Sequence, residues 1–319
     1  MTDLFYDIPG NPRPDGGVCG FLTARDGKKF RYAHFPPTAR PLNGTVVLLA
    51  GRNESIEKYF ETIRDLAARG FGVATLDWRG QGASDRLLHD GARGYVRSFD
   101  DYERDLEQFF SEVVLPDCRG PYYLLAHSTG ALVALLAAPS LVNRIRRMVL
   151  MAPFLALAKS PLSMQALGRF ASFCCGAGLG RLYAPGGRDT RKAEPFDQNK
   201  LTSDQRRYER NSLLYETYPQ LAVSGPTLAW IRAASNAIAR AQEPDFMARL
   251  QIPMLLVAAG ADAVVSSYAI EAYAARLRVG SMLTIRGARH ELLQEADIYR
   301  EQLLAAFDAF VPGSDAPVM

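Results

Sequence analysis

The chain of 319 residues contains few cysteines, few histidines and no long hydrophobic run. The four cysteines (Cys19, Cys118, Cys174 and Cys175) show neither the spacing of a metal site nor that of a disulfide framework. Cys174 and Cys175 are adjacent in a segment of small apolar residues, so we expect both to be reduced. This cysteine usage is typical of a protein in the reducing cytoplasm.

No run of about 18 or more apolar residues occurs, so the sequence predicts no membrane-spanning helix. The amino-terminal segment lacks a basic stretch followed by an apolar one, and we therefore expect no signal peptide. Hydrophobic residues make up 48% of the chain and charged residues 22%, which suits one large domain or a domain with an insertion.

The net charge of +3 is too small to indicate a nucleic-acid partner, but its distribution is uneven. Residues 155–240 carry 12 Lys and Arg against 6 Asp and Glu, a net charge of +6, so the rest of the chain carries −3. A basic middle segment in a nearly neutral protein is suited to anionic headgroups at a membrane or micelle surface. The alternative is a solvated surface rich in arginine.

Short apolar runs alternate with segments of helical period along most of the chain. We expect strands within residues 17–35 (a hairpin with Asp26-Gly27 at its turn), 45–50, 71–77, 122–125, 146–153, 253–260 and 281–287. Helices are expected at 55–70, 98–114, 130–138, 268–277 and 297–310. This alternation predicts an α/β fold with a mostly parallel central sheet and helices on both faces.

The alternation stops between residues 156 and 245, where helical segments occur without a clear strand. We interpret residues 156–245 as a mainly helical cap inserted into a core formed by residues 1–155 and 246–319.

Ser128 lies in the sequence AHSTG (126–130), directly after a predicted buried strand and directly before a predicted helix. A sharp strand-to-helix turn that exposes a nucleophile needs small flanking residues, and Ala126 and Gly130 are both small. The alternative is a serine that only caps the helix. A nucleophilic serine needs a base, which in turn needs an acid to orient it.

Only four histidines are available as the base. His290 alone follows Ser128 and lies beyond a late strand, whereas His34 lies in the hairpin and His89 in a loop. His127 adjoins the nucleophile and points away from it, so we expect it to pack or to form hydrogen bonds beneath the turn.

Asp262 is the candidate acid, because it lies two residues past Gly260 in a loop after a predicted strand. Its alternative role is to form that turn. The loop after Pro153 holds no carboxylate, and Glu291 adjoins His290 too closely to reach its ring.

Two backbone N–H groups are expected to form an oxyanion hole. The residue after the nucleophile, Thr129, supplies one of them. The loop after the strand at 45–50 supplies the other from Arg52, and Gly51 permits a close approach.

With these elements in this order, the chain resembles the α/β-hydrolase superfamily along essentially its full length. DWRGQGAS (77–84) resembles the run D-x-R-G-x-G-x-S of that superfamily, and GADAVVSS (260–267) and GARHELLQE (287–295) resemble its acid and histidine segments. More narrowly, AGRNESIEKY (50–59), NKLTSDQRRYERN (199–211) and SGPTLAWI (224–231) are similar to bacterial lysophospholipases related to monoacylglycerol lipases.

The chain departs from the monoacylglycerol lipases in two places. They usually carry His-Gly before the oxyanion donor, where this chain has Ala50-Gly51, and its turn begins with Ala126. Neither change removes a catalytic group.

The resemblance implies that acyl esters are hydrolysed through a covalent acyl-enzyme, with Ser128 as nucleophile, His290 as base and Asp262 as its acid, and without a cofactor or metal. A lysophospholipase is the favoured function. The alternatives are a monoacylglycerol lipase, a general carboxylesterase, an aminopeptidase on the same fold, or a non-catalytic ligand-binding protein with an intact triad.

The substrate clues lie in the oxyanion loop and the cap. The Arg52 side chain is a candidate for binding a phosphate near the ester, with a local ion pair to Glu54 as the alternative. Trp230 either borders the pocket entrance or anchors the cap. The apolar segment 153–185, which contains Lys159, Arg169 and Arg181, either lines an acyl-chain tunnel or contacts a membrane peripherally, or it packs on the core.

Overall fold

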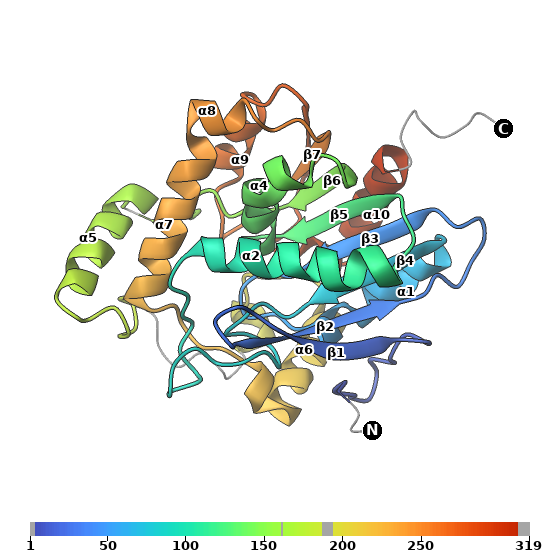
Figure 1. Ribbon diagram of the computed structural model, residues 1–319, viewed down its shortest axis with the longest axis horizontal. Coiled ribbons are helices and arrows are strands. Elements are labelled where there is room, and N and C mark those ends of the chain that lie inside the picture. Colours follow the sequence, from blue (N-terminus) through green and yellow to red (C-terminus); the bar gives the residue numbers. More distant parts are fainter. Residues whose placement is uncertain (1–3, 161, 187–193, 312–319) are drawn as a thin grey trace.

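The computed structural model describes residues 4–160, 162–186 and 194–311. An eight-stranded sheet of order β1-β2-β4-β3-β5-β6-β7-β8 crosses the molecule, with β2 antiparallel to both of its neighbours and the other pairs parallel (Figure 1). The strands are β1 (Val18–Thr23), β2 (Lys29–Phe35), β3 (Gly44–Leu49), β4 (Phe71–Leu76), β5 (Tyr122–His127), β6 (Ile145–Met151), β7 (Met254–Ala259) and β8 (Gly280–Ile285). The predicted α/β class and the mostly parallel sheet are confirmed.

Helices cover both faces of the sheet. The longer ones are α1 (Phe60–Ala68), α2 (Phe99–Phe109), α4 (Thr129–Leu141), α5 (Met164–Gly176), α6 (Gln205–Thr217), α7 (Leu228–Gln242), α9 (Ser267–Ala274) and α10 (Asp297–Phe310). The shorter helical segments are the 3₁₀ helices η1 (Ile56–Tyr59), η3 (Phe196–Gln198), η4 (Pro219–Leu221) and η5 (Leu292–Gln294), the π-helix η2 (Phe110–Val114), and the short α-helices α3 (Leu115–Asp117) and α8 (Pro244–Met247). The helix expected at 55–70 thus begins with a 3₁₀ turn, and the one expected at 268–277 ends at Ala274.

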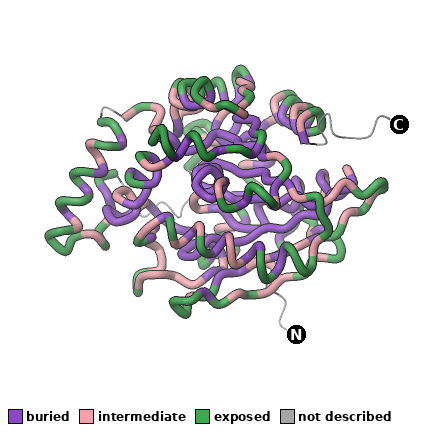
Figure 2. Tube along the Cα trace, turned by 45° about the horizontal axis from the view of Figure 1, so that its top comes forward, coloured by how far each residue is buried: buried purple, intermediate pink, exposed green. Residues whose placement is uncertain are grey.

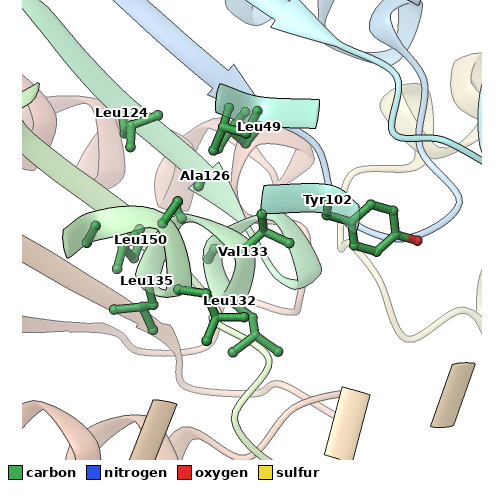
Figure 3. Packing of buried hydrophobic residues seen from close by; sticks show 14 of the residues in the cluster. Leu49, Tyr102, Leu124, Ala126, Leu132, Val133, Leu135 and Leu150 are labelled. Carbon is green, nitrogen blue, oxygen red and sulfur yellow. The ribbon is translucent and has the colours of Figure 1, made fainter. Parts of the chain in front are cut away.

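The strands are hydrophobic throughout because both faces of the sheet are buried. In β3, Val47 and Leu49 belong to the apolar cluster under α2, α4, α7 and α9, whereas Val46 and Leu48 belong to the cluster under α1 and α10. Figure 2 shows the buried chain running through the middle of the molecule. Figure 3 shows part of the first cluster, to which Leu124 and Ala126 of β5 and Leu132 and Val133 of α4 belong.

The strand register brings three strand ends to one edge of the sheet. Leu49 of β3 pairs with Ala126 of β5, and His127 of β5 pairs with Met151 of β6. Because these strands are parallel, the loops that begin at Ala50, Ser128 and Ala152 leave the sheet side by side.

Among the described residues between β6 and β7, no strand joins the sheet. Within this segment α5 packs on α7, and α7 continues the core cluster with Trp230, Ala234 and Ile238. At its other end, Arg207 of α6 pairs with Glu61 of α1. The described segment is therefore helical, and two of its helices are fixed directly to the rest of the chain; its status as a separate cap remains a prediction.

A buried ion-pair cluster holds the antiparallel edge of the sheet. Arg31 of β2 pairs at 2.7 Å with both Glu57 of η1 and Asp77 after β4, and all three side chains are fully buried. The two carboxylates hold the pKa of Arg31 far above its ordinary value although burial opposes this. No helix in the described ranges is long and apolar enough to cross a bilayer.

Candidate active site

Ser128 occupies a strained turn between β5 and α4. Its φ of 52° lies in the left-handed region, which a residue with a side chain rarely adopts. Neighbouring main chain fixes it there: Ser128 N–H donates to Met151 O at 2.9 Å, and Ser128 O accepts from Leu132 N–H at 3.1 Å and Phe154 N–H at 3.2 Å. The structure thus places Ser128 in the sharp strand-to-helix turn that its sequence context predicts.

The turn needs a small residue at position 130. A Cβ atom added to Gly130 would lie 2.4 Å from Ala50 O and 2.7 Å from Leu49 O, which are main-chain atoms that cannot move aside cheaply. Ala126 is fully buried in the core cluster, so its methyl group fits where the resembled families often have glycine.

The structure brings Ser128, His290 and Asp262 into one hydrogen-bonded series from three loops. His290 Nε2 lies 3.1 Å from Ser128 Oγ, and His290 Nδ1 lies 2.8 Å from Asp262 Oδ2. The other carboxylate oxygen of Asp262 accepts the N–H groups of Val264 at 2.7 Å and Val265 at 3.0 Å. This geometry allows His290 to take a proton from Ser128 while Asp262 holds the opposite ring nitrogen.

The site is largely shielded from water. Ser128 is 8% exposed and His290 is 5% exposed. Shielding strengthens the electrostatic interactions of the side chains with a reacting group.

The loop after β3 lies beside this serine, and several hydrogen bonds fix it. Gly51 N–H donates to the Glu54 carboxylate, and Asn53 N–H donates to Gln81 Oε1 at 2.5 Å. The N–H groups of Arg52 and Thr129 meet no acceptor among the described residues. Both therefore remain candidates for the oxyanion hole.

The Arg52 side chain does not form the expected alternative pair with Glu54. Its Nη1 donates to Ser224 O at 2.9 Å, and its guanidinium carbon lies 5.7 Å from the centre of the Trp230 ring. Glu54 pairs instead with Lys58, whose Nζ lies 2.9 Å from Glu54 Oε1, and with His127, whose Nδ1 lies 3.2 Å from the same oxygen.

Trp230 is 4% exposed, and its ring stacks on Phe154 with centroids 5.9 Å apart. This burial agrees with the interpretation of Trp230 as an anchor. Its contact with Arg52 also places it near the loop after β3.

Sequence reasoning missed the charged groups beneath the serine. Glu54, Lys58 and Glu291 form a buried cluster, with Lys58 Nζ 2.9 Å from Glu54 Oε1 and 2.6 Å from Glu291 Oε1. The spacing Glu54-x-x-x-Lys58 is a signal of a helical ion pair, but only the fold brings Glu291 to it. Among the described residues, no group of three or more His, Cys, Asp and Glu side chains is arranged to hold a metal ion.

Comparisons with known proteins identify the family of the chain. Residues 40–297 match the family model described as serine aminopeptidase, S33. The chain is 32% identical to lysophospholipase L2 of Escherichia coli strain K12, over 95% of this chain and 92% of that protein. It is 25% identical to monoglyceride lipase of Rattus norvegicus, over 77% of this chain and 74% of that protein.

The fold also matches solved structures. A soluble variant of monoglyceride lipase from Saccharomyces cerevisiae, in complex with a substrate analogue, superposes with a TM-score of 0.71 at 18% identity, covering 92% of this chain and 94% of that one. The chain therefore belongs to the serine aminopeptidase S33 family and has the α/β-hydrolase fold.

The packing at Gly130 predicts the effect of one added methyl group. Gly130→Ala is expected to lower the free energy of unfolding by about 1–3 kcal/mol, as overpacking does, because its Cβ meets the main chain at Ala50. Urea denaturation followed by circular dichroism measures this change. The matched control is Gly176→Ala at the end of α5, where an added Cβ meets no atom within 4 Å. Equal stability of the two variants would contradict the prediction.

Proposed function

We propose that this member of the family is a serine carboxylic-ester hydrolase that acts as a lysophospholipase. The observation that carries the proposal is the buried series Asp262–His290–Ser128, with 2.8 Å and 3.1 Å between its polar atoms. Relatives named lysophospholipase L2, aligned over nearly the whole chain, support a lysophospholipid as the substrate.

In the proposed reaction, Ser128 Oγ attacks the ester carbonyl carbon while His290 Nε2 takes the hydroxyl proton. The negative charge that develops on the carbonyl oxygen is stabilised by the N–H groups of Arg52 and Thr129. His290 then gives the proton to the leaving glycerophospho-alcohol, and an acyl-Ser128 ester remains. Water, deprotonated by His290, attacks the acyl carbon; as its bond to Ser128 Oγ breaks, His290 returns the proton to Ser128 and the fatty acid leaves. Asp262 holds the imidazole orientation throughout.

The Arg52 guanidinium supports a phosphate-bearing substrate. No carboxylate of the described residues forms an ion pair with it, and burial lowers its pKa to about 10, so it stays charged at neutral pH. Arg52 is half-buried, and its side-chain hydrogen bond goes to the neutral carbonyl of Ser224. A partly desolvated cation of this kind is stabilised when a ligand supplies an anion. We therefore assign Arg52 as the headgroup contact and Trp230 as the ring against which Arg52 rests.

We also propose that the outer side of α5 contacts a lipid surface. Phe170 is 51% exposed and Phe173 78% exposed on this helix. Residues 155–182 contain Lys159, Arg169 and Arg181 and no Asp or Glu. Exposed aromatic side chains with basic neighbours suit the surface of an anionic phospholipid layer.

A comparison of two substrates tests the substrate class. We expect a higher kcat/KM for a lysophospholipid than for a monoacylglycerol of equal chain length, and loss of both activities in Ser128→Ala. Preference for the monoacylglycerol would favour the monoacylglycerol lipase function, and slow turnover of both a general esterase. If Ser128→Ala retains wild-type activity, the proposed mechanism is wrong.

Arg52→Gln removes the charge and keeps an amide donor for Ser224 O. We expect kcat/KM for the lysophospholipid to fall about 10-fold or more relative to that for the monoacylglycerol, because a charge-assisted hydrogen bond contributes about 1.5–3 kcal/mol. The control is Arg276→Gln, since Arg276 also donates to one backbone carbonyl, Gln242 O at 2.8 Å. Equal losses on the two substrates would mean that Arg52 only positions the loop.

Replacing both exposed phenylalanines by serine (Phe170→Ser with Phe173→Ser) should weaken binding to vesicles of phosphatidylglycerol and phosphatidylcholine. We expect the partition coefficient in vesicle sedimentation to fall by at least about 10-fold, since one aromatic ring alone contributes about 1.5–3 kcal/mol when fully inserted. Tyr268→Ser on α9 is the control, because Tyr268 is 79% exposed outside this surface. Unchanged binding of the double variant would exclude α5 as the contact.

A further inference from the structure

His127 precedes the nucleophile, and both of its ring nitrogens face hydrogen-bond acceptors. Nε2 lies 3.1 Å from the backbone oxygen of His290, and Nδ1 lies 3.2 Å and 3.3 Å from the two carboxylate oxygens of Glu54. A backbone carbonyl can only accept, and an ionised carboxylate can only accept. Both ring nitrogens must therefore carry a proton for both contacts to be hydrogen bonds, which makes the ring an imidazolium.

The charges around this ring balance only if it is protonated. Glu54 and Glu291 each bring one negative charge into a region where their side chains are less than a tenth exposed, and Lys58 brings one positive charge. A protonated His127 supplies the second positive charge. An unbalanced charge at this depth would be costly.

The same contacts connect two catalytic loops. Glu54 accepts hydrogen bonds from Gly51 N–H in the oxyanion loop and from Tyr59 OH at 2.6 Å. Through His127, Glu54 is linked to the carbonyl of His290, and through Lys58 it is linked to the neighbouring Glu291. The rings of His127 and His290 also contact each other, with centroids 4.8 Å apart.

We propose that His127 is a positioning residue, held as an imidazolium by Glu54, which fixes the main chain of His290 and the oxyanion loop relative to each other. This proposal rests on the proposed hydrolase function for its effect on rate, but the protonation state of His127 is independent of it. His127 touches neither the substrate nor the reacting proton.

The groups that face this cluster favour the charged ring. Burial alone would lower the pKa of His127, but Glu54, with a smaller contribution from Glu291, raises it above the ordinary value, while Lys58 opposes the rise. Tyr59 and Tyr215 are held neutral, since burial and nearby carboxylates raise the pKa of each hydroxyl. Because the folded-state pKa of His127 is raised, its protonation stabilises the folded protein. This contribution to the free energy of unfolding is complete below about pH 6.5 and is lost as the pH rises through the folded-state pKa.

Nitrogen-15 NMR of the histidine rings tests the protonation state directly. At pH 7.5 an ordinary exposed histidine is mostly neutral. We expect one ring to show two protonated nitrogens at this pH and to disappear from the spectrum of His127→Asn. In Glu54→Gln, which keeps the side-chain shape and removes the charge, this ring should become neutral at lower pH than in the wild type. A neutral His127 ring in the wild type at pH 7.5 would overturn the proposal.

Kinetics with a short, water-soluble ester test the positioning role. Such an ester has no phosphate headgroup, so its rate does not depend on the proposed contact with Arg52. We expect His127→Asn to lower kcat by about 10- to 100-fold, as misplacement of a catalytic group does, with KM changed less than about three-fold. The control is His89→Asn in an exposed loop, which should retain wild-type values. Equal kcat in the two variants would refute the positioning role even if the ring is charged.

The two proposals fail in different ways. A wild-type protein that cleaves no ester would refute the hydrolase function, while the NMR spectrum would still decide the charge of His127. If His127→Asn does not fold, Glu54→Gln takes its place in both measurements. An unchanged kcat in that variant, together with an unchanged ring titration, would overturn the proposal.

Discussion

The active site depends on the backbone conformation of Ser128. A residue with a side chain at φ 52° is strained, so surrounding structure must hold it. Three main-chain hydrogen bonds do so, from the end of β6, from α4 and from Phe154. The end of β3 closes the turn from the other side, since Gly130 packs against the carbonyl groups of Leu49 and Ala50. The register of three parallel strands thus fixes the proposed nucleophile, and the loops that supply its partners begin at the same edge.

Buried charge then fixes those loops. Below the serine, Glu54 and Lys58 hold the loop after β3, which is the proposed oxyanion loop, and Glu291. At the antiparallel edge, Arg31 ties η1 to β2 and to Asp77. Such buried ion pairs add little to the net free energy of unfolding, because the cost of desolvation offsets their attraction. Their charged groups must nevertheless lie in one arrangement to be paired, so they fix the loops that carry them. Asp77 shows the consequence: it binds Arg31, and it also accepts the N–H of Ile56 at the start of η1. The cluster therefore sets the direction in which the chain leaves the oxyanion loop.

The sequence predicted the candidate site best where the site residues directly follow strands, because the order of the strands then determines where those residues lie. Ser128, Asp262 and His290 each follow a predicted strand, and parallel strands end at one edge, so their proximity could be predicted from order alone. The role of the Arg52 side chain could not, because its partners Ser224 and Trp230 lie more than 170 residues further along the chain. Likewise, Glu54 reads as a local partner for Arg52, whereas the fold gives it Lys58 and His127. Long-range side-chain partners of this kind have no periodic signal in a single sequence.

The segment between β6 and β7 combines two different physical environments. Arg207 and Arg210 of α6 bind Glu61 of α1, and the main chain of Leu201 accepts the N–H of Glu291, next to the catalytic candidate His290. This part is thus anchored beside the chemistry. In contrast, α5 rests on α7 through Ala171 and Cys174 and exposes Phe173 on its other side. An anchored half beside the histidine loop and an apolar half that faces outward suit the function that we propose, since the proposed triad must stay fixed while a lipid substrate enters from an apolar surface.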